Sequence, residues 1–349
     1  MYFVAGFFGF IVVAGLVLAL VLGALFSAPA HRGIASDHFD GRRFTNYDGT
    51  KAHGGAALFR WMMNREPGQW EEDLREDYGK HPLRHFRDGI RITFVNHSTF
   101  LIQVDGINIL TDPVWSKRVS PVSWAGPKRM RLPGIRFEDL PPIHVVAISH
   151  NHYDHLDIPT MRLLAGGHHP RIVVPLGVKS FLEKEGMANV SEIDWWGEQD
   201  LGNGVTLKAV PAQHFSGRGM FDRDATLWCG FVLKTSAGSI YFAGDTGYNA
   251  RMFQDIAEKA GPIRFALLPI GAYKPEWFMS PIHTSPKEAV KIHLDLSPEK
   301  SIATHFGTFP LADDGRDDPV IDLRAALAER GVSDDDFLVM KEGEYQVFE

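Results

Sequence analysis

The chain reads S-H-N-H-Y-D-H-L-D from Ser149 to Asp157. In this stretch the pattern H-x-H-x-D-H supplies four candidate metal ligands, which are His150, His152, Asp154 and His155. Imidazole nitrogens and carboxylate oxygens are ligands that zinc and similar divalent ions accept. A tight loop can fold this spacing around two adjacent ions, so the stretch predicts a metal site. A polar loop with coincidental histidines is the alternative.

Three further candidate ligands lie far along the chain, and each follows an apolar segment that predicts a strand. They are His214, Asp245 and His305. The opening stretch also follows such a segment, at residues 144–148. Strand ends along one edge of a sheet bring distant residues to one point. We therefore expect all seven side chains to meet there.

Strand and helix patterns alternate over the rest of the chain. Strands are predicted at 91–95, 100–104, 107–110, 144–148, 171–174, 205–210, 231–234, 239–243, 264–268, 301–304 and within 337–347, and helices at 157–164, 179–185, 286–294 and 317–330. Asp105-Gly106 predicts a tight hairpin between two of the strands. Two sets of strands, each with helices, predict two packed sheets that helices cover on their outer faces.

The composition is that of an ordinary globular protein. Of 349 residues, 44% are hydrophobic and 23% are charged, which is sufficient for a sizeable core. The net charge of -7 gives no electrostatic reason to expect a nucleic-acid partner. Cys229 is the only cysteine, which excludes an intrachain disulfide and a cysteine-based zinc site.

The N-terminal segment is unusually apolar. Residues 1–30 contain no Asp, Glu, Lys or Arg, and residues 3–26 are apolar apart from small residues. About 20 such residues can span a bilayer as a helix, whereas a cleavable signal usually has a charged start and a shorter core of about 7–15 residues. We therefore expect residues 1–30 to form a transmembrane helix, a single-pass membrane anchor, with a signal segment as the alternative. The basic residues that follow the segment are Arg32, Arg42 and Arg43, and they favour a catalytic part in the cytoplasm. If the segment were a cleaved export signal, the catalytic part would lie on the other side of the membrane.

Residues 31–85 are interpreted as a connector, or N-terminal extension, with a short amphipathic helix at 56–64. Three side chains of this helix are expected to pack on the main domain: Trp61, Met62 and Met63. Further along, one basic cluster is either a solvated face or a contact for an anionic headgroup: Lys128, Arg129 and Arg131.

The seven candidate ligands divide into two shells. We assign one metal to His150, His152 and His214, and the other to Asp154, His155 and His305. Asp245 bridges both metals, and a shared water completes the shells. Two metals about 3.5–4 Å apart lower the pKa of the shared water and hold the substrate's oxygens, so Asp154 and Asp245 are counted as catalytic. We expect two zinc ions per chain, although the ligands also suit iron or manganese.

Two residues outside the ligand set are assigned supporting roles. Asp112 follows a strand and either orients a ligand histidine through its carboxylate or caps a turn. His283 lies in a Pro-containing loop before a helix and is the candidate proton donor or phosphate contact. The remaining histidines considered lack a ligand pattern and are expected to be structural or exposed: His97, His144, His168, His169 and His293.

Longer strings carry a resemblance beyond the metal motif. They are L-T-D-P-V-W-S-K-R-V-S-P-V-S-W-A-G-P-K-R (110–129), S-H-N-H-Y-D-H-L-D (149–157), D-W-W (194–196), F-A-G-D-T-G-Y (242–248), P-I-G-A-Y-K-P-E-W-F-M (269–279) and H-F-G-T-F (305–309). With them the chain resembles the metallo-β-lactamase superfamily and, within it, the N-acylphosphatidylethanolamine-hydrolysing phospholipases D. One departure is Ile282-His283, where that family has a Gln-His pair, so the His carries over and the Gln does not.

The resemblance implies an α/β protein with the αβ/βα four-layer sandwich of the metallo-β-lactamase fold and a dinuclear zinc site in residues 86–349. It also implies a phosphodiesterase of the phospholipase D type that releases N-acylethanolamine and phosphatidic acid. The partners expected are a phospholipid substrate, the membrane bilayer and, as an alternative to a monomer, a second copy in a homodimer. Two other functions stay open: another hydrolase of the same fold, such as a lactonase with a small polar pocket, and a non-catalytic lipid-binding envelope protein.

Overall fold

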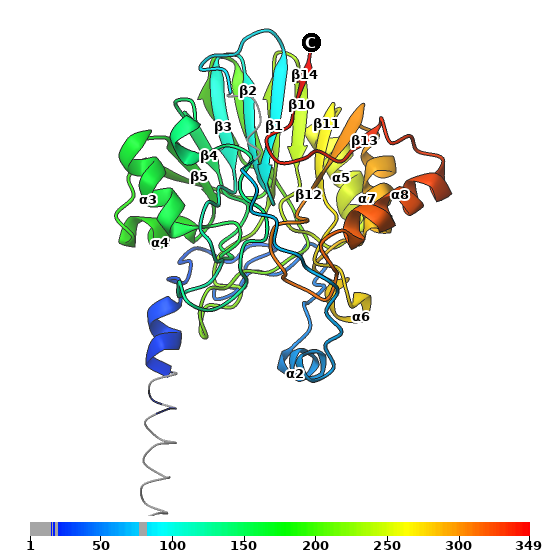
Figure 1. The fold of residues 1–349 in the computed structure, drawn as a ribbon. Helices are drawn as coiled ribbons and strands as arrows, with labels where there is room; N and C mark the ends of the chain where they lie inside the picture. Colours follow the sequence, from blue (N-terminus) through cyan, green and yellow to red (C-terminus); the bar gives the residue numbers. More distant parts are fainter. Residues whose placement is uncertain (1–14, 16, 18–19, 77–81) are drawn as a thin grey trace, which may run out of the picture.

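A computed structural model describes residues 15, 17, 20–76 and 82–349. Two sheets pack face to face, and helices cover the outer face of each, as Figure 1 shows. The first sheet has the order β14 (Tyr345–Phe348), β1 (Ile90–Asn96), β2 (Thr99–Val104), β3 (Ile107–Thr111), β4 (Val145–Ala147), β5 (Arg171–Pro175) and β6 (Val190–Ile193). The second has the order β13 (Phe337–Leu338), β12 (Lys300–Thr304), β11 (Phe265–Pro269), β10 (Gly238–Phe242), β9 (Gly230–Thr235), β8 (Val205–Val210) and β7 (Glu198–Gly202).

Each sheet mixes antiparallel and parallel pairs. In the first sheet β1, β2 and β3 pair antiparallel, and the pairs from β3 to β6 are parallel. The turn between β2 and β3 contains Asp105 and Gly106 at φ values of 51° and 79°, which is the left-handed backbone that a tight hairpin turn requires. The labelled helices are α2 (Gly55–Met63), α3 (Ile158–Gly167), α4 (Val178–Lys184), α5 (Ala250–Ala260), α6 (Glu276–Met279), α7 (Pro286–Leu296) and α8 (Asp318–Arg330), with a 3-10 turn at Phe137–Asp139. Residues 20–26 are also helical.

Alternation along the strands explains how one sheet is buried on both faces. Val145 and Ala147 of β4 belong to the core between the sheets, whereas Val146 belongs to the core beneath α3 and α4. Successive strand side chains point to opposite faces, so a wholly apolar strand requires cover on both sides. The predicted arrangement of two sheets with helices on their outer faces is confirmed.

The prediction of a single-pass membrane anchor is wrong by this structure. No helix within residues 15, 17, 20–76 and 82–349 is long and apolar enough to cross a membrane. Much of the predicted span lies outside the described residues, namely positions 1–14, 16, 18 and 19. An apolar run shows that a segment is hydrophobic, but it does not by itself establish a helix of spanning length. The membrane localisation that rested on this segment is corrected accordingly.

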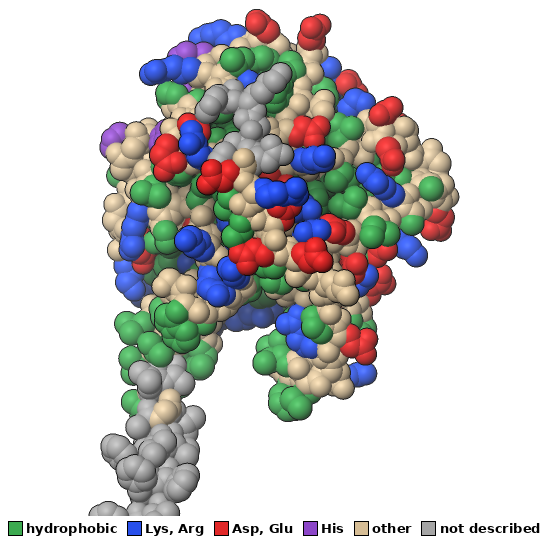
Figure 2. Space-filling model, viewed as in Figure 1, with side chains coloured by type: hydrophobic (Ala, Val, Ile, Leu, Met, Phe, Trp, Pro, Cys, Tyr) green, Lys and Arg blue, Asp and Glu red, His purple; other side chains and the backbone are tan. Residues whose placement is uncertain are grey.

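The N-terminal extension packs on the main domain through fewer side chains than predicted. The Trp61 ring stacks on Phe278 of α6 with centroids 5.0 Å apart. Met62 and Met63 are 61% and 68% exposed, so the prediction that they pack is wrong. Figure 2 shows hydrophobic side chains on the protruding lobe that α2 forms. Ala57 packs against the same small cluster, and the Arg60 guanidinium lies 4.8 Å from the Trp277 ring centroid of α6.

The basic cluster at 128–131 is not one solvated face. Arg129 is buried and donates hydrogen bonds to the carbonyl oxygens of Val114 and Ser116. Lys128 pairs with Glu72 at 2.7 Å between Nζ and Oε2. The cluster therefore fixes the loop after β3 instead of presenting free cations.

Candidate metal centre

The structure brings the seven predicted ligands together at one edge of the sandwich, where strands of both sheets end. Four of them follow β4, and single ligands follow β8, β10 and β12. Each strand is fixed by its ladder and by the core, so its end is a rigid support for the side chain that follows. Long-range pairing of the strands thus assembles a site from residues that are far apart in sequence.

One cluster contains three histidines. The ligand-capable atoms of His150, His152 and His214 all lie within 4.8 Å of one another. His152 Nδ1 lies 2.9 Å from His150 Nε2 and 3.2 Å from His214 Nε2. Three imidazole nitrogens this close together, two of them on side chains that also line a cavity, could hold one divalent metal ion and leave a position open to the cavity.

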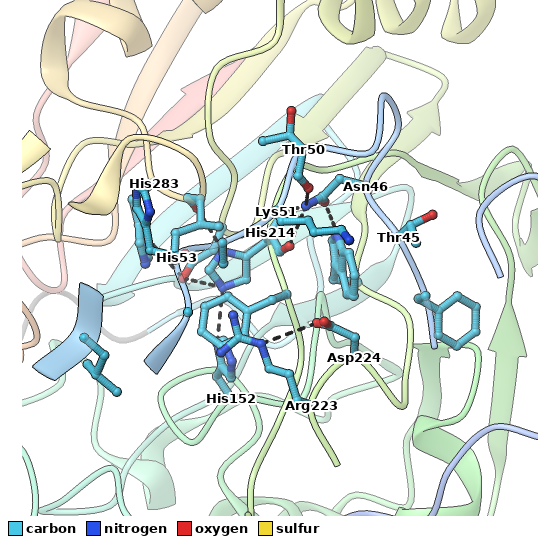
Figure 3. A pocket seen from close by; sticks show the side chains of 18 of the residues that line it. Thr45, Asn46, Thr50, Lys51, His53, His152, His214, Arg223, Asp224 and His283 are labelled. Carbon is cyan, nitrogen blue, oxygen red and sulfur yellow. Dashed lines mark hydrogen bonds and ion pairs between the residues drawn. The ribbon is translucent and has the colours of Figure 1, made fainter. Parts of the chain in front are cut away.

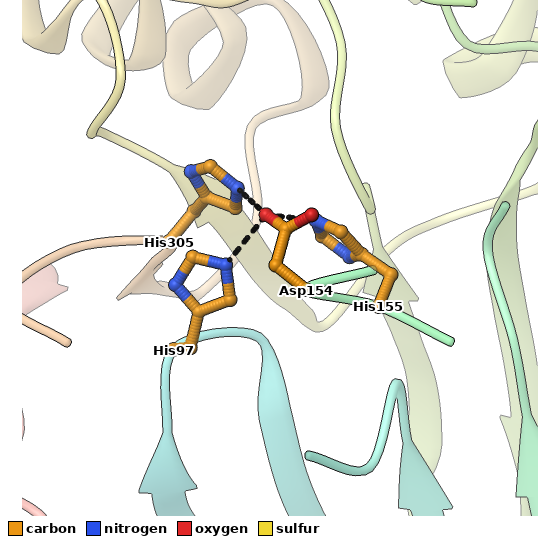
Figure 4. Close-up of side chains that lie close together, drawn as sticks. All are labelled: His97, Asp154, His155 and His305. Carbon is orange, nitrogen blue, oxygen red and sulfur yellow. Dashed lines mark hydrogen bonds and ion pairs between the residues drawn. The ribbon is translucent and has the colours of Figure 1, made fainter. Parts of the chain in front are cut away.

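The second cluster, shown in Figure 4, surrounds the carboxylate of Asp154. Asp154 Oδ2 lies 3.3 Å from Nε2 of both His155 and His305. A third histidine, His97, also belongs to the cluster, with its Nε2 3.1 Å from the same oxygen. The cluster therefore has one member more than the sequence predicted.

Asp245 lies between the two clusters. Its Oδ2 is 3.2 Å from Nε2 of both His155 and His305. The same oxygen is 3.7 Å from His214 Nε2 and 4.0 Å from His150 Nε2. One carboxylate thus faces both clusters, which is the position that a bridging ligand would occupy.

The protonation of the first cluster suits metal binding. Burial lowers the pKa of His150 well below its ordinary value and lowers the pKa of His152 and of His214 to about 3. These imidazoles are therefore neutral at pH 7, the state in which a ring nitrogen has a lone pair for a metal.

The carboxylates around the second cluster favour positive charge on two of its histidines. Burial alone would lower the pKa of His305, but Asp245 and Asp154 raise it to about 9. Burial likewise opposes the charge on His155, yet the same carboxylates raise its pKa well above the ordinary value. The buried atoms His155 Nε2 and Asp245 Oδ1 make no hydrogen bond to any described residue. The residues present therefore fit divalent cations, which would supply the positive charge and occupy these atoms.

Asp112 contacts the predicted ligand His155 through the ring nitrogen that does not face Asp154. Its Oδ2 lies 2.7 Å from His155 Nδ1, and it accepts hydrogen bonds from the backbone N–H and hydroxyl of Ser149. This contact directs His155 Nε2 toward the carboxylates of Asp154 and Asp245, the role that carboxylate partners have for metal-ligating histidines.

His283 borders the site. Its Nδ1 lies 3.9 Å from Asp245 Oδ2, and its ring centroid is 5.0 Å from that of His214. Burial lowers its pKa to about 3, so the ring is neutral and can donate from one nitrogen. It lies on the cavity side of the clusters, where a substrate would contact it.

Three residues at this centre were not predicted from the sequence, namely His97, Asn46 and Arg218. His97, expected to be structural or exposed, is buried beside Asp154 and belongs to a group of side chains that could hold a metal ion. The signal was present: His97 directly follows β1, as the ligands follow their strands. The other histidines of that group lie elsewhere; for example, His293 Nδ1 is 2.9 Å from Ser301 Oγ beneath α7.

Asn46 and Arg218 hold the ligand-bearing loops. Asn46 accepts from the backbone N–H of His214 and donates to its carbonyl oxygen, each at 2.9 Å. Arg218 Nη1 donates to the carbonyl oxygens of Asn151 and Leu156, at 2.8 and 2.9 Å. Neither residue belongs to a motif, so only the folded chain reveals its role.

A cavity of about 900 Å³ opens beside both clusters (Figure 3). His152, His214 and His283 line one end of it. The N-terminal extension forms another wall, which includes α2. The apolar part of the lining includes Leu58, Trp61, Phe215, Phe278, Met279 and Leu311. The cavity therefore joins a polar, metal-binding end to an apolar wall.

Two facing sheets with His and Asp clusters at their strand ends define the class of metal-dependent hydrolases. A family model described as the beta-lactamase superfamily domain matches residues 107–306, which is more than half of the chain. The chain therefore belongs to the metallo-β-lactamase superfamily, and it is a metal-dependent hydrolase of that superfamily.

Individual relatives agree with this assignment. The chain is 38% identical to an N-acyl-phosphatidylethanolamine-hydrolyzing phospholipase D 1 of Caenorhabditis elegans over 65% of this chain and 66% of the relative. That match spans just under two thirds of the relative's length. A metal-dependent hydrolase of Pyrobaculum neutrophilum is 30% identical over 73% of this chain and 98% of the relative.

Solved structures share the fold. The isothiocyanate hydrolase from Delia radicum gut bacteria superposes with a TM-score of 0.59 at 20% identity, covering 74% of this chain and 98% of that chain. The resemblance to the superfamily that the sequence strings indicated is confirmed.

Proposed function

We propose that the chain is a zinc-dependent phosphodiesterase of the phospholipase D type, which cleaves N-acylphosphatidylethanolamine to N-acylethanolamine and phosphatidic acid. The observation that carries this proposal is the cavity of about 900 Å³, because it joins the metal-ligand clusters to an apolar wall. A phospholipid has this same combination of a polar, phosphorylated end and apolar chains. The similarity to the phospholipase D 1 of Caenorhabditis elegans supports the same substrate class.

The residues at the centre would act in distinct ways. The two clusters would hold two zinc ions, which supply a nucleophilic hydroxide at neutral pH and neutralise phosphoryl charge. Asp112 keeps His155 oriented, and Asp245 ties the two clusters together. His283, which is neutral and lines the cavity, would donate a hydrogen bond from its ring N–H to a phosphoryl oxygen.

The apolar wall argues against a small polar substrate such as a sugar-phosphate lactone. Trp61, Phe278 and Leu311 form an apolar surface on which acyl chains could lie, and this part of the wall would give a sugar few hydrogen-bond partners. A lactonase would be expected to present polar side chains in their place.

The test is hydrolysis of N-acylphosphatidylethanolamine in detergent micelles by purified, zinc-loaded protein, with release of N-acylethanolamine measured by mass spectrometry. We expect turnover that chelation abolishes and zinc restores, and a loss of at least about 100-fold in kcat for Asp245→Asn. The unfolding temperature of the variant shows whether it is folded. No zinc-dependent release by folded wild-type protein would overturn the proposal.

A further inference from the structure

The cavity has a second charged region outside the metal-ligand clusters. Three cationic side chains line it: Arg43, Lys51 and Arg223. The first two precede α2, and the third lies in the loop between β8 and β9. Figure 3 shows Lys51 and Arg223 in the same cavity as His152 and His214. We name these three side chains the cationic subsite.

The carboxylates beside the cationic subsite do not balance it. Arg223 Nε lies 3.7 Å from Asp224 Oδ1, and Arg43 and Lys51 also attract that carboxylate. Asp40, which also lines the cavity, accepts a hydrogen bond from the backbone N–H of Arg43 at 2.7 Å. The other two lining carboxylates, Asp154 and Asp245, belong to the metal-ligand clusters. Outside those clusters, three cations therefore face two carboxylates, one of which is engaged with the backbone.

The subsite also contains donors without acceptors. Arg43 Nη2 donates to the Phe221 carbonyl oxygen at 2.9 Å, but its Nη1 is buried and has no hydrogen-bond partner in the described part of the chain. Lys51 is exposed at the cavity and makes no salt bridge to a described residue. Lys51 is the donor that a group in the cavity can reach, so an anionic ligand there would pair with it.

We propose that the cationic subsite binds an acidic group on the substrate's headgroup, beyond the scissile phosphodiester. This proposal rests on the proposed function, because it assumes that the phosphodiester lies at the metal-ligand clusters and the acyl chains on the apolar wall. The preferred substrate is then an anionic phospholipid whose headgroup carries a carboxylate, in addition to its phosphate.

Equilibrium binding tests the subsite without turnover. Isothermal titration of zinc-loaded protein would compare dihexanoyl phosphatidylserine with dihexanoyl phosphatidylethanolamine, which differ by one carboxylate. We expect the serine lipid to bind roughly three- to tenfold more tightly, because charge-assisted hydrogen bonds at a partly exposed site are of modest strength. Lys51→Met should lower this ratio about two- to threefold, and Lys51→Met with Arg43→Met should bring it near one.

A matched control lies outside the cavity. Lys287 is an exposed lysine of α7, so Lys287→Met removes the same charge from the protein without touching the cationic subsite. It should leave the ratio of the two affinities at the wild-type value. A ratio near one in wild-type protein, or an equal change in Lys287→Met and Lys51→Met, would overturn the proposal.

Kinetics separate this proposal from the proposed function. N-acylphosphatidylserine and N-acylphosphatidylethanolamine share the scissile bond, and we expect the first to have the lower KM, with the difference reduced in Lys51→Met. If neither lipid is cleaved while the binding ratio behaves as expected, the proposed function fails and the subsite stands. If both are cleaved with equal KM and bind equally, the subsite fails and the proposed function stands.

Discussion

His97 connects the β1–β2 turn to the second ligand cluster. Its Nε2 lies 3.1 Å from Asp154 Oδ2, and its ring packs against His305 with centroids 4.1 Å apart. His97→Phe keeps a ring of similar shape and removes the nitrogen. Because contacts behind metal ligands commonly change affinity by 10–100-fold, we expect a loss of roughly that size for the more weakly held metal.

The measurement for His97 is competition for metal with a chelator, together with elemental analysis of metal per chain. His169→Phe is the control, since His169 is exposed and lies outside both clusters. Unchanged metal affinity and stoichiometry in His97→Phe would show that the contact with Asp154 does not support binding.

His293 gives stability a defined pH dependence. Burial lowers its pKa below the ordinary 6.5, and its Nδ1 lies 2.9 Å from Ser301 Oγ. The unfolded chain therefore binds this proton at a higher pH than the folded chain. Its contribution to stability is present above about pH 6.5 and decreases as the pH falls below that value.

Urea unfolding of wild-type protein and His293→Gln at pH 7.5 and 5.5 tests this sign. We expect the variant to be less stable at pH 7.5 but to lose less stability on acidification, since the glutamine does not titrate. A variant that loses as much as wild type between the two pH values would contradict the assignment.

At the scale of elements, the ligand loop after β4 depends on Arg218. The guanidinium donates to two carbonyl oxygens of the loop and lies 3.9 Å from the Tyr153 ring centroid. Arg218→Met leaves both acceptors without their partner, so we expect a loss of roughly 2–3 kcal/mol in the free energy of unfolding. Urea unfolding measures it.

Arg162→Met is the matched control for Arg218. Arg162 is 61% exposed and pairs with Glu185 on the surface, so its loss should change stability by less than about 1 kcal/mol. Equal effects of the two substitutions would mean that Arg218 does not brace the loop.

Buried strands could be predicted from the sequence, whereas the exposed edge strand β7 could not. β11 is buried along its length and its apolar run, F-A-L-L-P, is plain in the sequence, whereas β1, I-R-I-T-F-V-N, is recognised by the alternation of its apolar residues. The edge strand β7, with the sequence Glu198–Gly202, is half exposed and polar, and no strand was predicted there. A hydrophobic pattern indicates that a strand is buried. An exposed edge strand is held instead by backbone hydrogen bonds to its one neighbouring strand.

The candidate site was predictable to the extent that its residues lie in local patterns. His150 and its neighbours form a dense motif, and the remaining ligands follow apolar strands. Asn46 has no such signal, because its partner His214 is 168 residues away. Contacts of this kind are set by the path of the extension across the finished fold, which no local pattern encodes.

At the scale of the whole molecule, the metals would join the two sheets. The ligands follow β4 in the first sheet and β8, β10 and β12 in the second. Removal of the ions would leave buried carboxylates and imidazoles without their counter-charges. Because ligand binding stabilises the folded state by about 4 kcal/mol at 1,000 times Kd, we expect chelation to lower Tm by roughly 5 °C.

Calorimetry of the as-purified, chelated and zinc-restored protein measures this shift. Restoration with zinc controls for damage by the chelator. Equal Tm values for the three samples, with metal loss verified by elemental analysis, would contradict a metal link between the sheets.

The wall that residues 43–61 contribute to the cavity lies outside the stretch 107–306 that defines the superfamily. Most of the rest of the cavity lining, including Arg223 and Phe278, lies within that stretch, so the extension completes a cavity that the superfamily domain begins. A related chain could carry a different extension beside the same metal-ligand clusters, provided that a residue like Asn46 still hydrogen-bonds to the His214 backbone. Replacing the extension would therefore change part of the cavity wall while the seven predicted metal ligands stay the same.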